Sequence, residues 1–138
     1  MRRYLVPEPR IAIAEALRAH ASAAMDVSDG LAGDLAKLCR VSGVATDIEV
    51  TRVPLSDAAR VALATEPALI ETVVTGGDDY EVLACVPPDK LEALRRRAIA
   101  AGVAITDIGT VAAGQGQARF VDARGQPLVL TRPSFSHF

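Results

Sequence analysis

The chain has 138 residues, half of them apolar and 4% aromatic, and its 15 basic and 17 acidic residues give a formal net charge of -2. This length fits one domain, and the apolar fraction is enough for a core built from Val, Leu, Ile and Ala. The lack of a basic excess argues against a nucleic-acid-binding protein, and the lack of a long apolar run argues against a signal peptide or membrane span, so we expect a cytoplasmic protein.

The first half of the chain predicts alternating helices and strands. Leu31, Leu35 and Leu38 recur at the spacing of one helix face, and Gly43 is placed to end that helix. In chain order, we expect a helix over 11–20, a strand near 22–26, a helix over 29–41, a strand over 44–53 with one wetter face, and a helix to about residue 64 capped by Ser56.

The second half predicts more strands. Residues 68–74 fit either a helix face or a strand, and we favour a helix because Gly76 and Gly77 suit a helix end. The apolar run at 80–86 predicts a strand in the centre of a sheet. The remaining expected elements are a helix from Pro88 to about residue 101, with Arg95, Arg96 and Arg97 on a solvated face, and strands over 103–111, 118–122 and 128–130.

These elements predict an α+β fold. Helices and strands are intermixed along the chain, but several of the connections are as short as those of hairpins. Such short connections do not suit a doubly wound parallel sheet. We therefore expect a mixed β-sheet packed with helices.

The most informative stretch is MDVSDGLAGD at residues 25–34, where a strand leads through a tight turn into a helix. Ser28 or Asp29 can cap that helix with a side-chain oxygen, and Gly30 lets the backbone approach a ligand closely. A helix N-terminus suits an anion, and Mg²⁺ held by Asp26 and Asp29 would let a phosphate bind beside these carboxylates. The alternative is that these are ordinary capping and first-turn residues.

A second acidic stretch, GGDDYE at residues 76–81, precedes the strand expected at 80–86. Its glycines free the backbone and allow a ligand to come close. The alternative is a polar turn before a buried strand. Beside Asp26 and Asp29 the functional interpretation gains weight, because phosphoryl-transfer sites gather carboxylates around metal ions.

Several stretches together resemble the thiamine-monophosphate kinases, a family in the superfamily of aminoimidazole ribonucleotide synthase. MDVSDGLAGDL resembles the DISDGL-type motif of this family, and TGGDDYEVL at 75–83 resembles its GGEDYEL. RRYLVPEPRI at 2–11 resembles the linker into the C-terminal domain of the family. ITDIGTV at 105–111 and the terminal SFSHF resemble its late strand and its aromatic tail. The matches keep the same order over nearly the whole chain.

The resemblance implies a Mg²⁺-dependent kinase that transfers the γ-phosphoryl group of ATP to thiamine monophosphate and forms thiamine diphosphate. It makes Asp26 and Asp29 the catalytic metal ligands and places Ser28 against ATP. It assigns substrate binding to Asp78, which stands where the family usually has glutamate, and to Phe135, the aromatic residue of the tail.

The resemblance also implies that residues 1–138 form the C-terminal domain of a two-domain kinase, with the α/β sandwich of that superfamily. The N-terminal domain would supply the remaining metal ligands, so we expect the chain alone to be inactive and the whole enzyme to be a homodimer. Two alternatives stay open. The chain could belong to another ATP-dependent enzyme of the superfamily, or it could be a non-catalytic domain that binds or dimerises.

Overall fold

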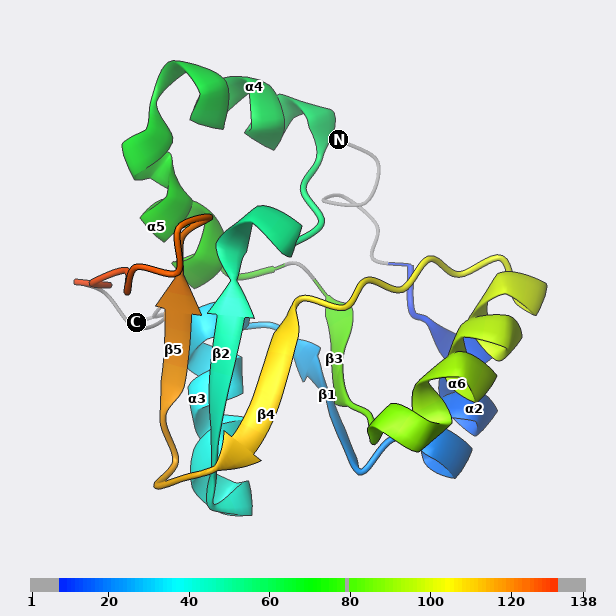
Figure 1. The fold of residues 1–138 in the computed structure, drawn as a ribbon. Helices are drawn as coiled ribbons and strands as arrows, with labels where there is room; N and C mark the ends of the chain where they lie inside the picture. Colours follow the sequence, from blue (N-terminus) through cyan, green and yellow to red (C-terminus); the bar gives the residue numbers. More distant parts are fainter. Residues whose placement is uncertain (1–7, 79, 132–138) are drawn as a thin grey trace. The chain divides into compact units, whose positions relative to one another are not determined.

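A computed structural model describes residues 8–78 and 80–131 (Figure 1). The chain divides into two compact units, of which the first combines residues 1–28 with 78–105 and the second combines 29–77 with 106–138. Helices and strands occur in both units, which confirms the expected α+β class. Within the described ranges, no helix is both long enough and apolar enough to cross a membrane.

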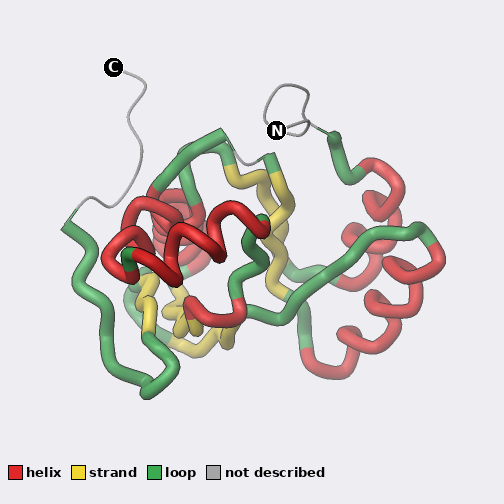
Figure 2. The backbone as a smooth tube through the Cα atoms, turned by 90° about the horizontal axis from the view of Figure 1, so that it is seen from above, coloured by secondary structure: helices red, strands yellow, loops and turns green. Residues whose placement is uncertain are grey.

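The first unit contains a two-stranded antiparallel sheet and a pair of helices. Strand β1 (Ala23–Val27) pairs with β3 (Glu81–Cys85), and the register sets Asp26 opposite Val82. After a 3₁₀ turn, η1 (Ile11–Ile13), helix α2 (Ala14–His20) lies beside α6 (Pro88–Ala100), as Figures 1 and 2 show. The buried apolar residues of this unit are Ile13, Ala16, Val27, Leu83, Leu94 and Ala98.

The strand expected at 80–86 is confirmed as β3, but its expected central position is wrong. In the part of the chain that the structure describes, β3 has one hydrogen-bonded neighbour, β1. Leu83 is 9% exposed and Val82 is 37% exposed, so the two faces of the strand differ. A run of apolar residues therefore indicated a strand here without indicating its place in the sheet.

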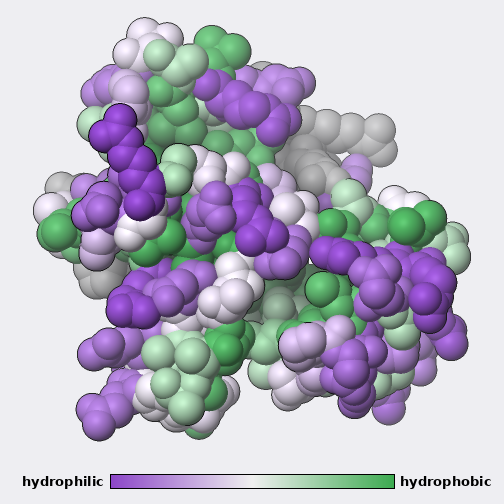
Figure 3. Space-filling view, in the orientation of Figure 1, coloured by the Kyte–Doolittle hydropathy of each residue, from purple (hydrophilic) through white to green (hydrophobic). Residues whose placement is uncertain are grey.

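Helix α6 carries its arginines on the outside, as expected. Pro88 occupies the first turn, where its missing N–H costs no hydrogen bond. Arg95 donates to Glu92 Oε1 at 2.6 Å, and Arg96 and Arg97 are exposed. Hydrophilic side chains cover much of the α6 region in Figure 3. These contacts are those of a solvated helix face.

The second unit is built on a three-stranded mixed sheet. Strand β2 (Val44–Glu49) lies in the middle, antiparallel to β4 (Gly109–Ala113) and parallel to β5 (Ala118–Val121). Helix α3 (Leu31–Ser42) packs against β2 and β5 (Figure 1). Thr46, Ile48 and Val50 are buried while the residues between them are half-buried, which confirms the predicted wetter face.

The other elements of this unit agree with the expectations in kind and differ in their bounds. Ser56 caps helix α4 (Asp57–Thr65) by accepting from the Ala59 N–H at 3.1 Å. The favoured helix over 68–74 is confirmed as η3 (Pro67–Leu69) followed by α5 (Ile70–Thr75).

Three of the expected strands differ most from the structure. The strand expected over 44–53 ends at Glu49, where the chain turns into η2 (Val50–Arg52), and the strand expected over 103–111 starts only at Gly109. The last expected pairing reduces to a bridge between Val121 and Pro127 and a hydrogen bond from the Leu128 N–H to the Phe120 carbonyl oxygen at 2.8 Å. The buried apolar residues of the unit are Leu31, Ala32, Leu35, Leu38, Cys39, Ile48, Val50, Val74 and Phe120.

Candidate functional site

The two acidic motifs meet through their main chains in the first unit. The Asp78 N–H donates to the Ser28 carbonyl oxygen at 2.9 Å, and the Tyr80 N–H donates to the Val27 carbonyl oxygen at 2.8 Å. These bonds lie just beyond the last ladder pair, Val27 opposite Glu81, and depart from the register of β1 with β3. Asp26 is exposed on β1, and Ser28 and Asp78 are half-buried. The strands therefore bring together three of the residues that the sequence singled out.

The second motif adopts an unusual backbone conformation. Asp78 has a φ of 68° and Tyr80 has a φ of 51°, both in the left-handed region. Aspartate enters this region fairly readily, but for a bulky side chain such as tyrosine it is strained. The two hydrogen bonds to the first motif hold this conformation in place. Such strain, once observed, supports a functional role for the turn.

The Tyr80 hydroxyl donates to Asp78 Oδ1 at 3.1 Å, so the side chain of one motif residue orients that of another. This hydrogen bond is the main cause of a raised pKa of Tyr80. The charge of Asp78, partial burial and the charge of Asp26 raise the pKa further. The neutral phenol is thus the form that the surrounding carboxylates favour.

In the second unit, Asp29 is held by two residues of α3. The Asp29 N–H donates to Asp34 Oδ2 at 2.9 Å, and Lys37 Nζ donates to both Asp29 Oδ2 and Asp34 Oδ1, the latter at 2.9 Å. Asp34 is 1% exposed. The pKa of Lys37 is raised, first by the hydrogen bond to Asp29 and then by that to Asp34. These three residues form a closed ring of charge-assisted hydrogen bonds.

The predicted helix cap is wrong, and Gly30 has a structural role of its own. Helix α3 begins at Leu31 with Gly30 as its N-cap, and neither Ser28 nor Asp29 caps it. Gly30 has a φ of 96°, and a Cβ there would lie 2.7 Å from the carbonyl oxygens of Thr75 and Gly76. The glycine is thus required by its own backbone angle and by the close approach of the chain at residues 75–76.

Two parts of the predicted site lie outside the described residues. These are Asp79 within the second motif and the tail with Phe135. Both motifs also run from one unit into the other, since the unit boundaries fall after Ser28 and after Gly77.

Asp26 in the first unit and Asp29 in the second each carry a carboxylate of the kind that holds Mg²⁺. This ion is usually held by one or two carboxylates together with substrate phosphates. Among residues 8–78 and 80–131 no group of three or more His, Cys, Asp or Glu side chains is arranged to hold a metal ion. Asp29 already forms an ion pair with the Lys37 ammonium group. Such a donor set suits an ion that phosphates help to bind.

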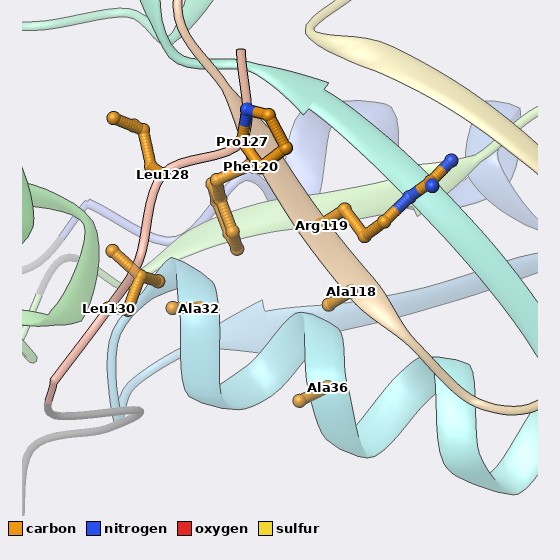
Figure 4. A pocket seen from close by; sticks show the side chains of 8 residues that line it. All are labelled: Ala32, Ala36, Ala118, Arg119, Phe120, Pro127, Leu128 and Leu130. Carbon is orange, nitrogen blue, oxygen red and sulfur yellow. The ribbon is translucent and has the colours of Figure 1, made fainter.

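A cavity of about 290 Å³ lies in the second unit, and neither Asp29 nor Lys37 lines it (Figure 4). Ala32 and Ala36 of α3 face it, together with Phe120 of β5 and the segment with Leu128 and Leu130. The Arg119 guanidinium turns away from it and binds Asp47 on β2 at 2.6 and 2.7 Å. This apolar lining does not suit a polyphosphate, and we assign the cavity no part in the site.

The chain belongs to the family described as AIR synthase related protein, C-terminal domain, whose model matches residues 3–122. This finding agrees with the α+β architecture and confirms the superfamily to which the sequence motifs pointed.

Individual relatives carry a more specific name. The chain is 39% identical over 127 residues to a protein of Caulobacter vibrioides named thiamine-monophosphate kinase, covering 90% of this chain and 36% of that one. A solved thiamine-monophosphate kinase from Stenotrophomonas maltophilia matches with a TM-score of 0.76 and 35% identity, over 92% of this chain and 39% of the other.

A third match is a structure described as AaThiL complexed with AMPPCP and TMP. It has a TM-score of 0.74 and 28% identity and covers 99% of this chain and 40% of that one. The chain thus spans about 40% of the length of these relatives.

Three residues that contact the predicted site residues were not predicted from the sequence. Asp34, Lys37 and Tyr80 were given no role. The spacing carried a usable signal, because Asp34 and Lys37 are three residues apart on one helix face and can both reach back to the turn. The contact of Tyr80 with Asp78 had no such signal, since it depends on two left-handed residues.

Proposed function

We propose that this chain is the C-terminal domain of a cytoplasmic kinase that transfers the γ-phosphoryl group of ATP to thiamine monophosphate, forming thiamine diphosphate. The observation that carries the proposal is the main-chain pairing of the two acidic motifs, Asp78 to Ser28 and Tyr80 to Val27. It brings the first-unit residues of the two motifs together, and phosphoryl transfer depends on such positioning. The names of the relatives support the same reaction.

In this proposal, Asp26 and Asp29 bind Mg²⁺, and Ser28 contacts ATP. The ion supplies charge neutralisation for the transferring phosphoryl group. Asp26 is exposed at the end of a paired strand, and Asp29 precedes a helix that fixes its backbone, so both carboxylates start from defined positions. Catalysis of this kind rests on positioning and charge, and it needs no covalent nucleophile.

Asp78 and Phe135 hold thiamine monophosphate in this proposal. Asp78 is one methylene shorter than the glutamate usual in the family, and its carboxylate is oriented by the Tyr80 hydroxyl. The N-terminal domain of the enzyme supplies the remaining metal ligands, and the whole enzyme is a dimer. The 138-residue chain by itself is then inactive, because two carboxylates cannot neutralise ATP and a second phosphate.

The test is formation of thiamine diphosphate by the full-length protein with Mg²⁺, ATP and thiamine monophosphate. The Asp26→Asn variant should lose most of its turnover and keep its thermal transition. Asp57→Asn is the matched control, because the Asp57 side chain is 99% exposed on α4 and should leave turnover unchanged.

The two alternatives give different results in the same assay. Another ATP-dependent enzyme of the superfamily would hydrolyse or use ATP without binding thiamine monophosphate. A non-catalytic domain would show no turnover in the full-length protein with either substrate. Normal turnover in Asp26→Asn would remove Asp26 from the site.

A further inference from the structure

Lys37 lies between two carboxylates of different character. Its Nζ hydrogen-bonds Asp29 Oδ2 and lies 2.9 Å from Asp34 Oδ1. The side chain of Asp34 is 2% exposed, that of Asp29 is 34% exposed and that of Lys37 is 45% exposed. The contact of Lys37 with Asp34 is therefore buried, and the contact of Lys37 with Asp29 is accessible from solvent.

The buried contact, between Lys37 and Asp34, is the one that has to be kept. A carboxylate removed from water is costly unless it is paired and hydrogen-bonded. Asp34 meets this requirement with the Asp29 N–H on one oxygen and the Lys37 ammonium on the other. Loss of Lys37 from Asp34 would leave a buried charge without this cation.

In the accessible contact, between Lys37 and Asp29, the lysine can be replaced by another cation at little cost in stability. Ion pairs of partly exposed side chains contribute little to stability. Another cation can therefore take the place of Lys37 at Asp29 while Lys37 stays on Asp34. Such an exchange needs no change in helix α3, because both carboxylates keep a cation throughout.

We propose that Lys37 is a positioning residue for Asp29. Its ammonium group holds the Asp29 carboxylate in place until a divalent metal ion binds Asp29 Oδ2, the oxygen that Lys37 contacts. The inference rests on the proposed function, in which Asp29 is a metal ligand. Lys37 thereby determines both the orientation of the Asp29 side chain and the affinity of the site at Asp29 for a metal ion. A merely stabilising lysine would set neither.

The probe is Mn²⁺ alone, added to the ¹⁵N-labelled 138-residue chain. Its paramagnetism broadens the amide signals of residues close to it, and the signals of Asp29 and Gly30 report on this corner. Half-maximal broadening in Lys37→Met should need about ten times less Mn²⁺ than in the unmodified chain, which corresponds to about 1.4 kcal/mol. The titration is run at about 0.5 M salt, where screening beyond roughly 4 Å removes most long-range charge effects.

The chain offers a matched control in its other lysine. Lys90→Met changes the net charge by the same amount but lies on α6 in the first unit, and it should leave the Mn²⁺ titration unchanged. Lys37→Arg restores the cation and should bring back the weaker binding. Lys37→Gln removes the charge but keeps a donor for Asp34, and it should shift the titration in the same direction as Lys37→Met. A thermal transition for each variant verifies folding.

Three results would overturn the proposal. One is equal or weaker Mn²⁺ binding in folded Lys37→Met and Lys37→Gln. Another is the same shift in Lys90→Met, and the third is absence of broadening at Asp29 in every variant. The kinase assay of the full-length protein separates these results from a failure of the proposed function. Turnover without the Lys37 effect retains the function and removes this inference, whereas the Lys37 effect without turnover does the reverse.

Discussion

The Asp78 amide lies 2.9 Å from the carbonyl oxygen of Ser28, so two acidic motifs that are far apart in sequence share a main-chain hydrogen bond. This contact makes the backbone, and not any side chain, the part of the structure that aligns the motifs. Substitutions of the carboxylates should therefore alter chemistry with little effect on the alignment. Substitutions that disturb the backbone at these turns should affect folding first.

Gly30→Ala should destabilise the chain more than Gly43→Ala. Gly43 has φ 62° and ψ 36°, in the left-handed region where an alanine costs about 1–2 kcal/mol, whereas Gly30 has φ 96° and ψ 149°, a conformation that is essentially restricted to glycine. At Gly43 a Cβ would meet nothing within 4 Å, whereas at Gly30 it would lie 2.7 Å from two carbonyl oxygens. That overlap adds about 1–3 kcal/mol. Urea denaturation of both variants measures the difference, and equal losses would show that the close approach at Gly30 is unimportant.

Tyr80 should ionise at a higher pH than a free tyrosine, whose pKa is 10.0, because its hydroxyl donates to the Asp78 carboxylate. The raised pKa in the folded state means that this hydrogen bond contributes below pH 10.0 and is lost as pH rises through the pKa of Tyr80. Phenolate absorbance measures it directly, since the chain has two tyrosines and no tryptophan.

The matched variants for that titration are Tyr4→Phe, which leaves Tyr80 as the single tyrosine, and Asp78→Asn in the same background. The asparagine removes the charge that opposes the phenolate, so the apparent pKa should fall. An unchanged pKa in Asp78→Asn would contradict the contact between these two side chains.

Asp34→Ala should be far more destabilising than Asp47→Ala. Asp34 is buried and accepts from the Asp29 N–H and from Lys37, and losing it costs about 1–3 kcal/mol for the donors left behind. Asp47 binds Arg119 in two places, but both side chains are largely exposed, and such a pair is worth about 0–1 kcal/mol. Chemical denaturation of the two variants compares them, and similar losses would mean that the ring around Asp29 adds no stability.

Phe135→Ala in the full-length enzyme should raise KM for thiamine monophosphate more than KM for ATP, if the tail stacks on the substrate as the proposal has it. Aromatic stacking is worth about 0.5–1.5 kcal/mol beyond area burial, so the change should be modest. Phe138→Ala, three residues on in the same tail, is the control and should change neither constant. An equal rise in both constants for Phe135→Ala would make the tail structural.

Local signals in the sequence predicted the helices well. Ser56 and Gly43 mark helix ends by side-chain capping and by a left-handed angle, and both act within a few residues. The alternation around Ile48 likewise reports burial on one face of β2. Such features depend on neighbours in the chain, so they can be found without knowing the fold.

Features that depend on distant residues were harder to predict. The place of β3 in its sheet follows from which strand pairs with it, and the need for glycine at position 30 follows from the path of the chain at Thr75. Of the candidate site, the motifs were found from sequence by resemblance. The Lys37 and Asp34 contacts to Asp29 were not found, because the start of helix α3 had been placed two residues too early.

The register that sets Ala23 opposite Cys85 has a consequence for synthesis on the ribosome. Strand β1 emerges with no partner, and β3 follows only after the whole intervening segment has been translated. At translation rates of about 5–20 residues per second, β1 waits on the order of several seconds for its hydrogen bonds. During that time its edge groups and the apolar side chain of Val27 are available to other nascent chains or to chaperones. The first unit therefore cannot be completed until residues 78–105 have been translated, although it contains the amino-terminal end of the chain, and the second unit, which needs residues 106–138, is completed later still.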